Sequence, residues 1–239
     1  MYDTETQKDM PFEKVAHKDV YRELIRTEHQ EHHSKKRWDE KFTNTEMIWP
    51  QIWKSLNNPI ATENTKTIIW EQIHLNDYCT FYYNKAHKTQ QKCPLCLQLP
   101  LDRFHLTLDC RITSILWKDL EFHLNKIHSK PITDLEKIFG LQGNTPGIIL
   151  RNWLTFLLRQ CIVQHESIAF YNKKGLANEA IIKMSYNQMV KNEVLTKYNI
   201  FTHLGRLDYF EQLFAVNKHL LAWNNEQWEI LTLYPTNSL

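Results

Sequence analysis

The sequence predicts a mainly α-helical protein, a helical bundle with an embedded Cys-Cys-His-Cys zinc knuckle. Glycine occurs only five times in 239 residues, which leaves few of the tight turns that sheet-rich folds need. Leucine, isoleucine, lysine, glutamate and glutamine recur instead at three- and four-residue steps, the spacing of one helix face. Three of the five cysteines lie between Cys93 and Cys110. The length allows roughly one or two domains.

The first predicted helix runs from about Phe12 to Phe42, with its apolar residues along one side. It also carries His29, His32 and His33, which have the spacing of a helical metal site. No cysteine or converging carboxylate pattern accompanies them, and a basic run from Lys35 to Arg37 follows directly. We therefore interpret these histidines as part of a solvated face.

An aromatic segment, Trp49 to Trp53, precedes the second predicted helix. Between the two, Pro59 and a cluster of asparagine and threonine residues up to Asn64 indicate a loop. The second helix is expected over Thr65 to Tyr78. Its buried face is expected to contain Ile69, Trp70 and Ile73.

Four more helices are expected after the cysteines. The first is amphipathic, because apolar residues from Ile112 to Ile127 recur at three- and four-residue steps. Thr145 and Pro146 suit the cap and first turn of the next helix, which continues to about residue 171. The last two are expected near Leu176–Tyr198 and Arg206–Trp223. We divide the chain into an N-terminal helical region (residues 1–58), a zinc-knuckle region (59–130) and a C-terminal helical region (131–239).

The protein is expected to be intracellular, either nuclear or cytoplasmic. Its first residues are polar and charged, unlike the apolar core of a signal peptide. The most apolar stretch, Gly147 to Phe170, is interrupted by Arg151 and Arg159, so it predicts a buried helix rather than a membrane span. Thiols stay reduced inside cells, where closely spaced cysteines more often hold metal than form disulfides.

The segment from Cys93 to Cys110 has the pattern Cys-x2-Cys-x8-His-x4-Cys. The two-residue gap between Cys93 and Cys96 lets one tight turn present both thiolates from the same side. His105 and Cys110 are spaced so that a short turn opening the next helix returns both to the same ion. Four protein ligands leave no position for a reactive water, so the pattern predicts a structural zinc site rather than a catalytic one.

A rival ligand set keeps Cys93 and Cys96 but adds His123 and His128. Its central gap of 26 residues exceeds the usual range of zinc fingers, and His123 lies on the apolar stripe of a predicted helix. We therefore favour the first set. The remaining cysteines are interpreted as ordinary buried residues: Cys79 and Cys161.

Several motifs occur in order along the middle of the chain. They are Trp49-x3-Trp53, Trp70-x3-His74, Cys-Pro-Leu-Cys with His-x4-Cys, and Leu116-Trp117 in the following helix. This order resembles the zinc-binding region near the C-terminus of reverse transcriptases from LINE-type (non-LTR) retrotransposons, over about Trp49 to Trp117. Leu101-Asp102 stands where family members usually have Glu-Thr. In such elements this region follows the polymerase and helps to hold template RNA or target DNA, so the resemblance implies a nucleic-acid role.

The charge around the cysteines agrees with a nucleic-acid partner, either RNA or DNA. Residues 79–130 carry 8 basic and 4 acidic side chains, a balance of +4, whereas residues 1–78 carry 11 and 14 and residues 131–239 carry 10 and 9. Basic side chains here are candidates for phosphate contacts and aromatic ones for stacking on unpaired bases. The candidates are Lys85, Lys88, Lys92, Arg103, Arg111, Tyr82 and Tyr83. Trp117 is a further aromatic candidate, although burial in the core is its more ordinary role.

The sequence does not predict an enzyme and indicates no small-molecule substrate. It contains no Asp-Asp dipeptide, which a polymerase of this kind uses to hold two metal ions, and no phosphate-cradling glycine loop. A nuclease built on Asp119, Asp134, Glu136 and Lys137 is the strongest enzymatic alternative, but a helix start with surface charges explains this run more simply. The other alternative is a helical scaffold for protein partners, pinned by structural zinc.

Overall fold

The computed structural model describes residues 2–3, 8–9, 33–43, 45–74, 92–98, 104–172, 178–224, 227–230 and 233. The chain divides into two compact units, Met1–Glu46 and Met47–Leu239. The larger unit contains the whole cysteine motif.

The smaller unit contains two short strands and one helix among its described residues. They are β1 (Tyr2–Asp3), which pairs antiparallel with β2 (Lys8–Asp9), and α2 (His33–Lys41). Near the end of α2, the rings of Trp38 and Phe42 stack with their centroids 6.2 Å apart. The helix predicted over Phe12 to Phe42 is thus confirmed in its last part. Its earlier part, including His29 and His32, lies outside the described residues.

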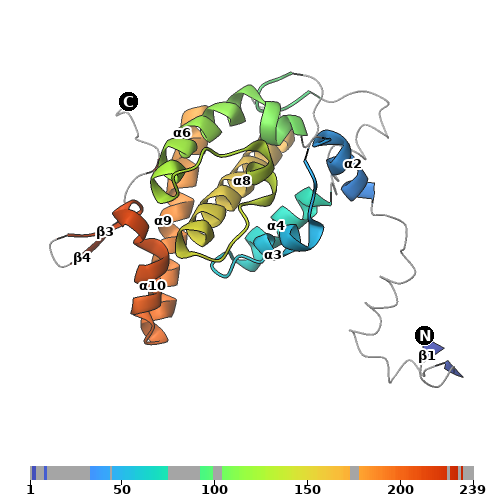
Figure 1. Ribbon diagram of the computed structural model, residues 1–239. Coiled ribbons are helices and arrows are strands. Elements are labelled where there is room, and N and C mark those ends of the chain that lie inside the picture. The colour runs from blue at the N-terminus through green and yellow to red at the C-terminus, as the bar shows by residue number, and fades with distance from the viewer. Residues whose placement is uncertain are drawn as a thin grey trace. The chain divides into compact units, whose positions relative to one another are not determined.

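The larger unit is mainly helical and ends in a β-hairpin, in agreement with the predicted fold class (Figure 1). Its elements are α3 (Trp49–Leu56), α4 (Glu63–Ile73), the π-helical turn η3 (His105–Asp109), α6 (Arg111–Ile127), α7 (Asp134–Phe139), α8 (Pro146–Asn172), α9 (Glu179–His203), α10 (Leu207–Phe214), the 3-10 turn η4 (Val216–Lys218), β3 (Leu221–Asn224) and β4 (Gln227–Ile230). The two strands pair antiparallel, with Trp223 opposite Trp228.

The long helix α8 is the centre of this unit. It contacts α4, α6, α9 and α10, which pack around it in Figure 1. Every residue from Leu150 to Ile162 is buried, so this part of α8 has no solvent face. A helix buried on all sides needs a mainly apolar sequence, and the interpretation of this stretch as a buried helix is confirmed. None of the described helices combines the length and apolarity needed to cross a membrane.

One buried arginine of α8 binds the end of a neighbouring helix. The Arg151 guanidinium donates hydrogen bonds to the carbonyl oxygens of Leu124 and His128, at 3.2 and 2.9 Å. It also forms a 3.4 Å ion pair with the buried carboxylate of Glu136. The last carbonyl groups of a helix have few partners inside the helix, so Arg151 satisfies the His128 carbonyl while Glu136 balances the Arg151 charge. The Asn217 side chain donates to the carbonyl groups of Lys126 and Ile127.

Most helices lie where the sequence predicts them. Helix α6 begins at Arg111, directly after the cysteine motif, and α8 begins at Pro146 behind Thr145. Helix α9 starts and ends a few residues later than predicted. Helix α4 begins two residues earlier than predicted, because Thr62 caps it by accepting a hydrogen bond from the Thr65 backbone amide. Residues 75–78 of the predicted second helix lie outside the described residues.

Several details differ from the predictions, and the short helix α7 is not among the helices expected after the cysteines. The aromatic segment starting at Trp49 forms a helix, α3, with Pro50 in its first turn. Trp70 is half exposed rather than buried. The prediction of a helix over Arg206–Trp223 is wrong beyond Phe214, where α10 ends. Asn217 then adopts a left-handed φ of 54°, which a continuing helix could not contain.

Both boundaries proposed between regions, after residues 58 and 130, fall inside the larger unit. Helix α3 contacts α4 across the first boundary, and α6 contacts α8 across the second. One hydrophobic core includes residues from Ile60 to Leu233.

Candidate metal centre

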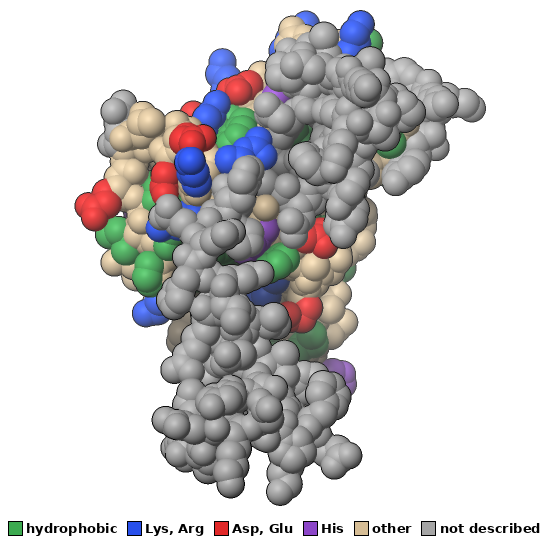
Figure 2. All heavy atoms as spheres, turned by 90° about the vertical axis from the view of Figure 1, so that its right-hand side faces the viewer, with side chains coloured by type: hydrophobic (Ala, Val, Ile, Leu, Met, Phe, Trp, Pro, Cys, Tyr) green, Lys and Arg blue, Asp and Glu red, His purple; other side chains and the backbone are tan. Residues whose placement is uncertain are grey.

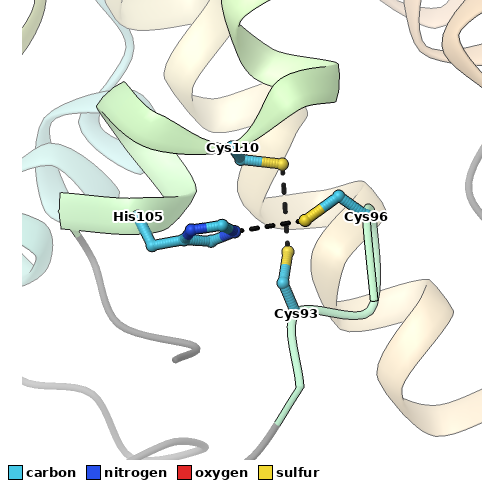
Figure 3. A group of neighbouring side chains, drawn as sticks. All are labelled: Cys93, Cys96, His105 and Cys110. Atoms are coloured by element: carbon cyan, nitrogen blue, oxygen red, sulfur yellow. Dashed lines mark hydrogen bonds between the residues drawn. The ribbon is translucent and has the colours of Figure 1, made fainter. Parts of the chain in front are cut away.

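Cys93, Cys96, His105 and Cys110 come together in the larger unit (Figure 3). Their ligand atoms, three sulfurs and one imidazole nitrogen, all lie within 4.8 Å of one another. Cys93 Sγ is 3.9 Å from Cys110 Sγ, and Cys96 Sγ is 3.2 Å from His105 Nε2. The structure therefore brings together all four residues of the predicted ligand set.

The separations suit a tetrahedral metal site. Zinc binds a thiolate at about 2.3 Å and an imidazole at about 2.0–2.1 Å, so a tetrahedron places two sulfurs about 3.8 Å apart and sulfur about 3.6 Å from nitrogen. The observed 3.9 and 3.2 Å lie close to these values. Cys93, Cys96 and Cys110 are free thiols, so each can supply a ligand.

The first two ligands lie on a tight loop formed by residues 92–98. The Leu97 amide donates to the Cys93 carbonyl at 2.7 Å, and the Cys93 amide donates to the Gln98 carbonyl at 2.9 Å. Leu97 has a φ of 62°, the left-handed conformation that glycine adopts most readily. This conformation turns the chain directly after Cys96. Leu95, between the two cysteines, is buried in the hydrophobic core and anchors the loop.

The third ligand lies on η3, the π-helical turn that leads into α6. The Cys110 amide donates a 2.6 Å hydrogen bond to the His105 carbonyl oxygen, so a single wide turn joins the last two ligands. Trp117 fixes this turn to α6, because its Nε1 donates to the Thr107 carbonyl at 2.7 Å. The prediction that a short turn before the next helix returns both ligands is confirmed.

The fourth ligand caps the N-terminus of α6. Cys110 has an extended backbone (φ −66°, ψ 127°), and the helix begins at the next residue. A hydrogen bond from Cys93 lowers the pKa of the Cys110 thiol to about 5, and the backbone amides of Thr113 and Ile112 act in the same direction, against the effect of burial. The N-terminus of a helix carries partial positive charge, so it stabilises a thiolate at this position.

The thiol of Cys93 has its pKa shifted in the opposite direction. Its hydrogen bond to Cys110, together with burial, raises the pKa of the Cys93 thiol well above its ordinary value. A cation bound to both sulfurs would displace any proton that they carry, because metal ligands of this type are thiolates.

The site is closed and mostly shielded from water. Cys93 and Cys110 are fully buried, His105 is buried and Cys96 is half-buried. Leu106, next to the histidine, belongs to the hydrophobic core. With four protein ligands there is no open position for water, so the arrangement suits a structural ion and not metal-assisted hydrolysis.

The rival histidine ligands are not part of this group. His123 Nδ1 lies 3.0 Å from His219 Nε2. Burial, followed by the charges of His219 and Lys126, lowers the pKa of His123 to about 4. Cys161 is buried in α8, its thiol donates to the Ile182 carbonyl at 3.7 Å, and burial raises its pKa to about 12. Its interpretation as a buried residue is confirmed, while Cys79 lies outside the described residues.

The acidic residues considered for a nuclease have structural partners. Asp119 forms a 2.6 Å ion pair with Lys183, and Asp134 forms a 2.7 Å ion pair with Lys137. Glu136 completes the capping box at the start of α7. In the part of the chain that the structure describes, the Cys-Cys-His-Cys group is the cluster of histidine, cysteine and acidic residues that could hold a metal ion.

Two of the candidate nucleic-acid-binding residues lie within the described ranges. Lys92 and Arg111 are both exposed, directly before the first ligand and directly after the last. Trp117 is buried in the core, which confirms its more ordinary role. On the face drawn in Figure 2, described Lys and Arg side chains stand beside Asp and Glu side chains. The other candidates lie outside the described residues: Tyr82, Tyr83, Lys85, Lys88 and Arg103.

Comparison of the chain with protein-family models, with curated proteins and with solved structures finds no match. The function therefore has to be argued from the chemistry of the site.

Proposed function

We propose that this chain is a non-catalytic nucleic-acid-binding protein in which a structural zinc ion fixes the segment from Cys93 to Cys110 on the helical core. The observation that carries the proposal is the group of four ligand atoms within 4.8 Å of one another, three of them on buried residues. Three thiolates and one imidazole in a tetrahedral arrangement form a common ligand set of structural zinc.

The charges beside the ligands support a nucleic-acid partner. Lys92 and Arg111 are exposed next to the first and last ligands, so an ion at this site would hold both side chains on one small rigid segment. The surrounding residues, 79–130, carry the positive balance of +4. Phosphate contacts from such residues provide affinity without sequence specificity. The resemblance to the C-terminal region of LINE-type reverse transcriptases supports the same role, with RNA or single-stranded DNA as the partner.

The test combines metal analysis with a binding assay on the full chain. Elemental analysis should give one zinc per chain. Binding is measured with a labelled single-stranded RNA and with a DNA of the same length. For each strand, the logarithm of the association constant should fall linearly with the logarithm of the salt concentration from about 50 to 200 mM. A protein without zinc would contradict the metal assignment. Zinc-loaded protein that binds neither strand would contradict the nucleic-acid role.

Exposed apolar residues on α9 favour a second candidate function, a zinc-pinned scaffold for protein partners. Ile181 and Met184 lie one turn apart and are both exposed, and Leu195 is exposed further along the helix. Exposed apolar side chains can contribute to protein-binding surfaces. A scaffold needs no phosphate contacts, so zinc-loaded protein without salt-dependent binding to nucleic acid would favour this alternative.

A further inference from the structure

Two exposed tryptophans lie beside an open cavity on α3 and α4, the neighbouring helices drawn in light blue and cyan in Figure 1. The cavity has a volume of about 330 Å³, within the range of small-ligand sites. Trp53 on α3 is 39% exposed and Trp70 on α4 is 50% exposed. The residues lining it are Trp53, Leu56, Asn57, Lys66, Thr67 and Trp70.

Ring contacts fix both tryptophans in place. The His74 imidazole stacks on Trp70 with a centroid distance of 3.8 Å and on Trp53 at 5.2 Å, with an interplanar angle of 26° in each case. Its Nδ1 lies 2.9 Å from the Trp70 carbonyl oxygen, which orients the ring. The ring of Trp49, also on α3, contacts the Trp53 ring with a centroid distance of 5.6 Å. Because these rings are already ordered, a ligand that stacks on them loses little of its binding energy to ordering side chains.

The polar groups around the cavity indicate which ligand fits. The Lys66 ammonium group disfavours a cationic ligand and favours an anionic one. Its ion pair with Glu63 is an exposed contact of 2.8 Å, and 88% of the Glu63 side chain is open to solvent. A phosphate can therefore compete for Lys66, since exposed pairs of this kind are weak. Asn57 and Thr67 add groups that can hydrogen-bond to the edge of a heterocyclic base.

We propose that Trp53 and Trp70 bind an unpaired nucleobase of a single-stranded nucleic acid, with Lys66 contacting the adjoining phosphate. A flat ring with an attached anion satisfies both features of the cavity, its exposed indole surfaces and its ammonium group. This inference rests on the proposed function and assigns base contacts to a surface separate from the metal ligands.

The test compares a labelled oligothymidylate with an abasic strand of the same length and charge. The full zinc-loaded chain should bind the oligothymidylate more tightly. Trp70→Ala should weaken that binding by roughly 5- to 150-fold, the range for loss of one stacked base, while leaving binding to the abasic strand unchanged. Trp70→Phe should retain part of the preference. Phe122→Ala is the matched control, because Phe122 is 61% exposed on α6 and contacts a lysine but does not line the cavity.

Circular dichroism and zinc content establish that each variant is folded before its binding is compared. Equal affinity of the wild-type chain for both strands, or an unchanged preference in Trp70→Ala, would overturn the base-binding site while leaving nucleic-acid binding intact. Failure to bind either strand would overturn both proposals. If sedimentation instead shows a dimer that Trp70→Ala converts to a monomer, the tryptophans form a protein interface and the base-binding proposal is wrong.

Discussion

Trp117 Nε1 donates a 2.7 Å hydrogen bond to the carbonyl oxygen of Thr107, so a core residue of α6 holds the turn that carries His105. The Trp117 ring is buried in the hydrophobic core, while Thr107 lies two residues after the metal ligand. This single contact therefore connects the packing of the helical unit with the geometry of the candidate metal centre. Its loss should affect stability and metal affinity together.

Trp117→Phe removes this bond and keeps most of the apolar ring. A buried carbonyl left without its partner costs about 1–3 kcal/mol, to which the smaller ring adds a packing loss. We expect a lower free energy of unfolding and weaker zinc binding, measured by urea denaturation and by competition with a chromophoric chelator.

Trp153→Phe is the matched control for that variant. Trp153 is also fully buried, but its Nε1 has no hydrogen-bond partner among the described residues, so the substitution removes ring volume and an unpaired N–H but no hydrogen bond. It should leave zinc affinity unchanged. Equal zinc affinity in the two variants would show that the Trp117 bond does not support the metal centre.

The ligand residues should control metal content and folding together. Cys93→Ser and His105→Ala each remove one ligand, so both should lower zinc content, helical content and melting temperature. A chelator should have the same effect on the wild-type chain, because metal binding contributes to folding free energy. Cys161→Ser is the control, since this thiol lies in α8 outside the ligand group. Equal zinc in all three variants would rule out the ligand assignment.

Leu97→Gly should stabilise the protein. A left-handed conformation costs a non-glycine residue about 1–2 kcal/mol, and glycine avoids this cost. The greater chain entropy of glycine in the unfolded state offsets about 0.5–1 kcal/mol of that stabilisation. We expect the free energy of unfolding of the metal-loaded chain, measured by urea denaturation, to increase by about 0.5–1 kcal/mol. Leu97 is exposed, so little packing is lost.

The reverse substitution provides the control. Gly205 has a similar φ of 64°, and a methyl group there would meet nothing within 4 Å. Gly205→Ala should therefore destabilise the protein through backbone strain alone. A destabilising Leu97→Gly would show that contacts of the leucine side chain outweigh its strain.

The His123–His219 pair should make the protein sensitive to acid. Burial is the main cause that lowers the pKa of both groups, to about 4 for His123 against an ordinary value of 6.5. The unfolded chain therefore binds more protons than the folded one between these values. The contribution of the neutral His123–His219 pair to the free energy of unfolding is complete above pH 6.5 and is lost as the pH falls toward 4.

Urea unfolding of His123→Gln tests this expectation. Glutamine does not titrate, so the stability of this variant should fall less steeply than that of the wild type between pH 6.5 and 4. Metal release at low pH affects both chains alike and cancels in the comparison. Identical slopes would mean that His123 titrates normally in the folded protein.

Charge reversal at Lys88 and Lys92 tests the phosphate contacts. The double substitution to glutamate should weaken binding to nucleic acid at low salt and reduce the slope of log affinity against log salt by about 1 to 2, since each phosphate contact contributes about 0.9. Melting temperature and zinc content should stay unchanged. Unaltered affinity would identify these lysines as solvated surface only.

Residue spacing carried most of the information about the helices and the ligand set. The cysteine pattern predicts that Cys93, Cys96, His105 and Cys110 come together, as the structure shows, because a structural metal ion requires a fixed number of ligands at short separations. Apolar periodicity places α6 because it reflects which side of that helix is buried, whereas a Thr-Pro start and a continuous apolar stretch place α8. Both signals are local in the sequence, so no knowledge of tertiary contacts is needed to interpret them.

The sequence did not predict features that depend on tertiary contacts. Trp70 is expected to be buried with Ile69 and Ile73, but it lines an open cavity between α3 and α4 and is half exposed. Its spacing from His74, four residues, could have indicated the ring stack. The hairpin after α10 was missed because Leu220 to Trp223 also has an apolar composition compatible with a helix, and the left-handed turn at Asn217 leaves little trace in the sequence.

Helix α6 starts directly after Cys110, and the Arg151 guanidinium binds the carbonyl oxygens of Leu124 and His128 at its other end. The packing of α6 against the core therefore places Cys110, and the turn before it places His105, without any ion. If these residues bind a metal ion, the entropy lost on coordination is smaller and the affinity depends on the whole helical unit. A synthetic peptide comprising only the four ligands and the residues between them should bind zinc more weakly than the intact chain, by an amount that reports how much of the site is preorganised.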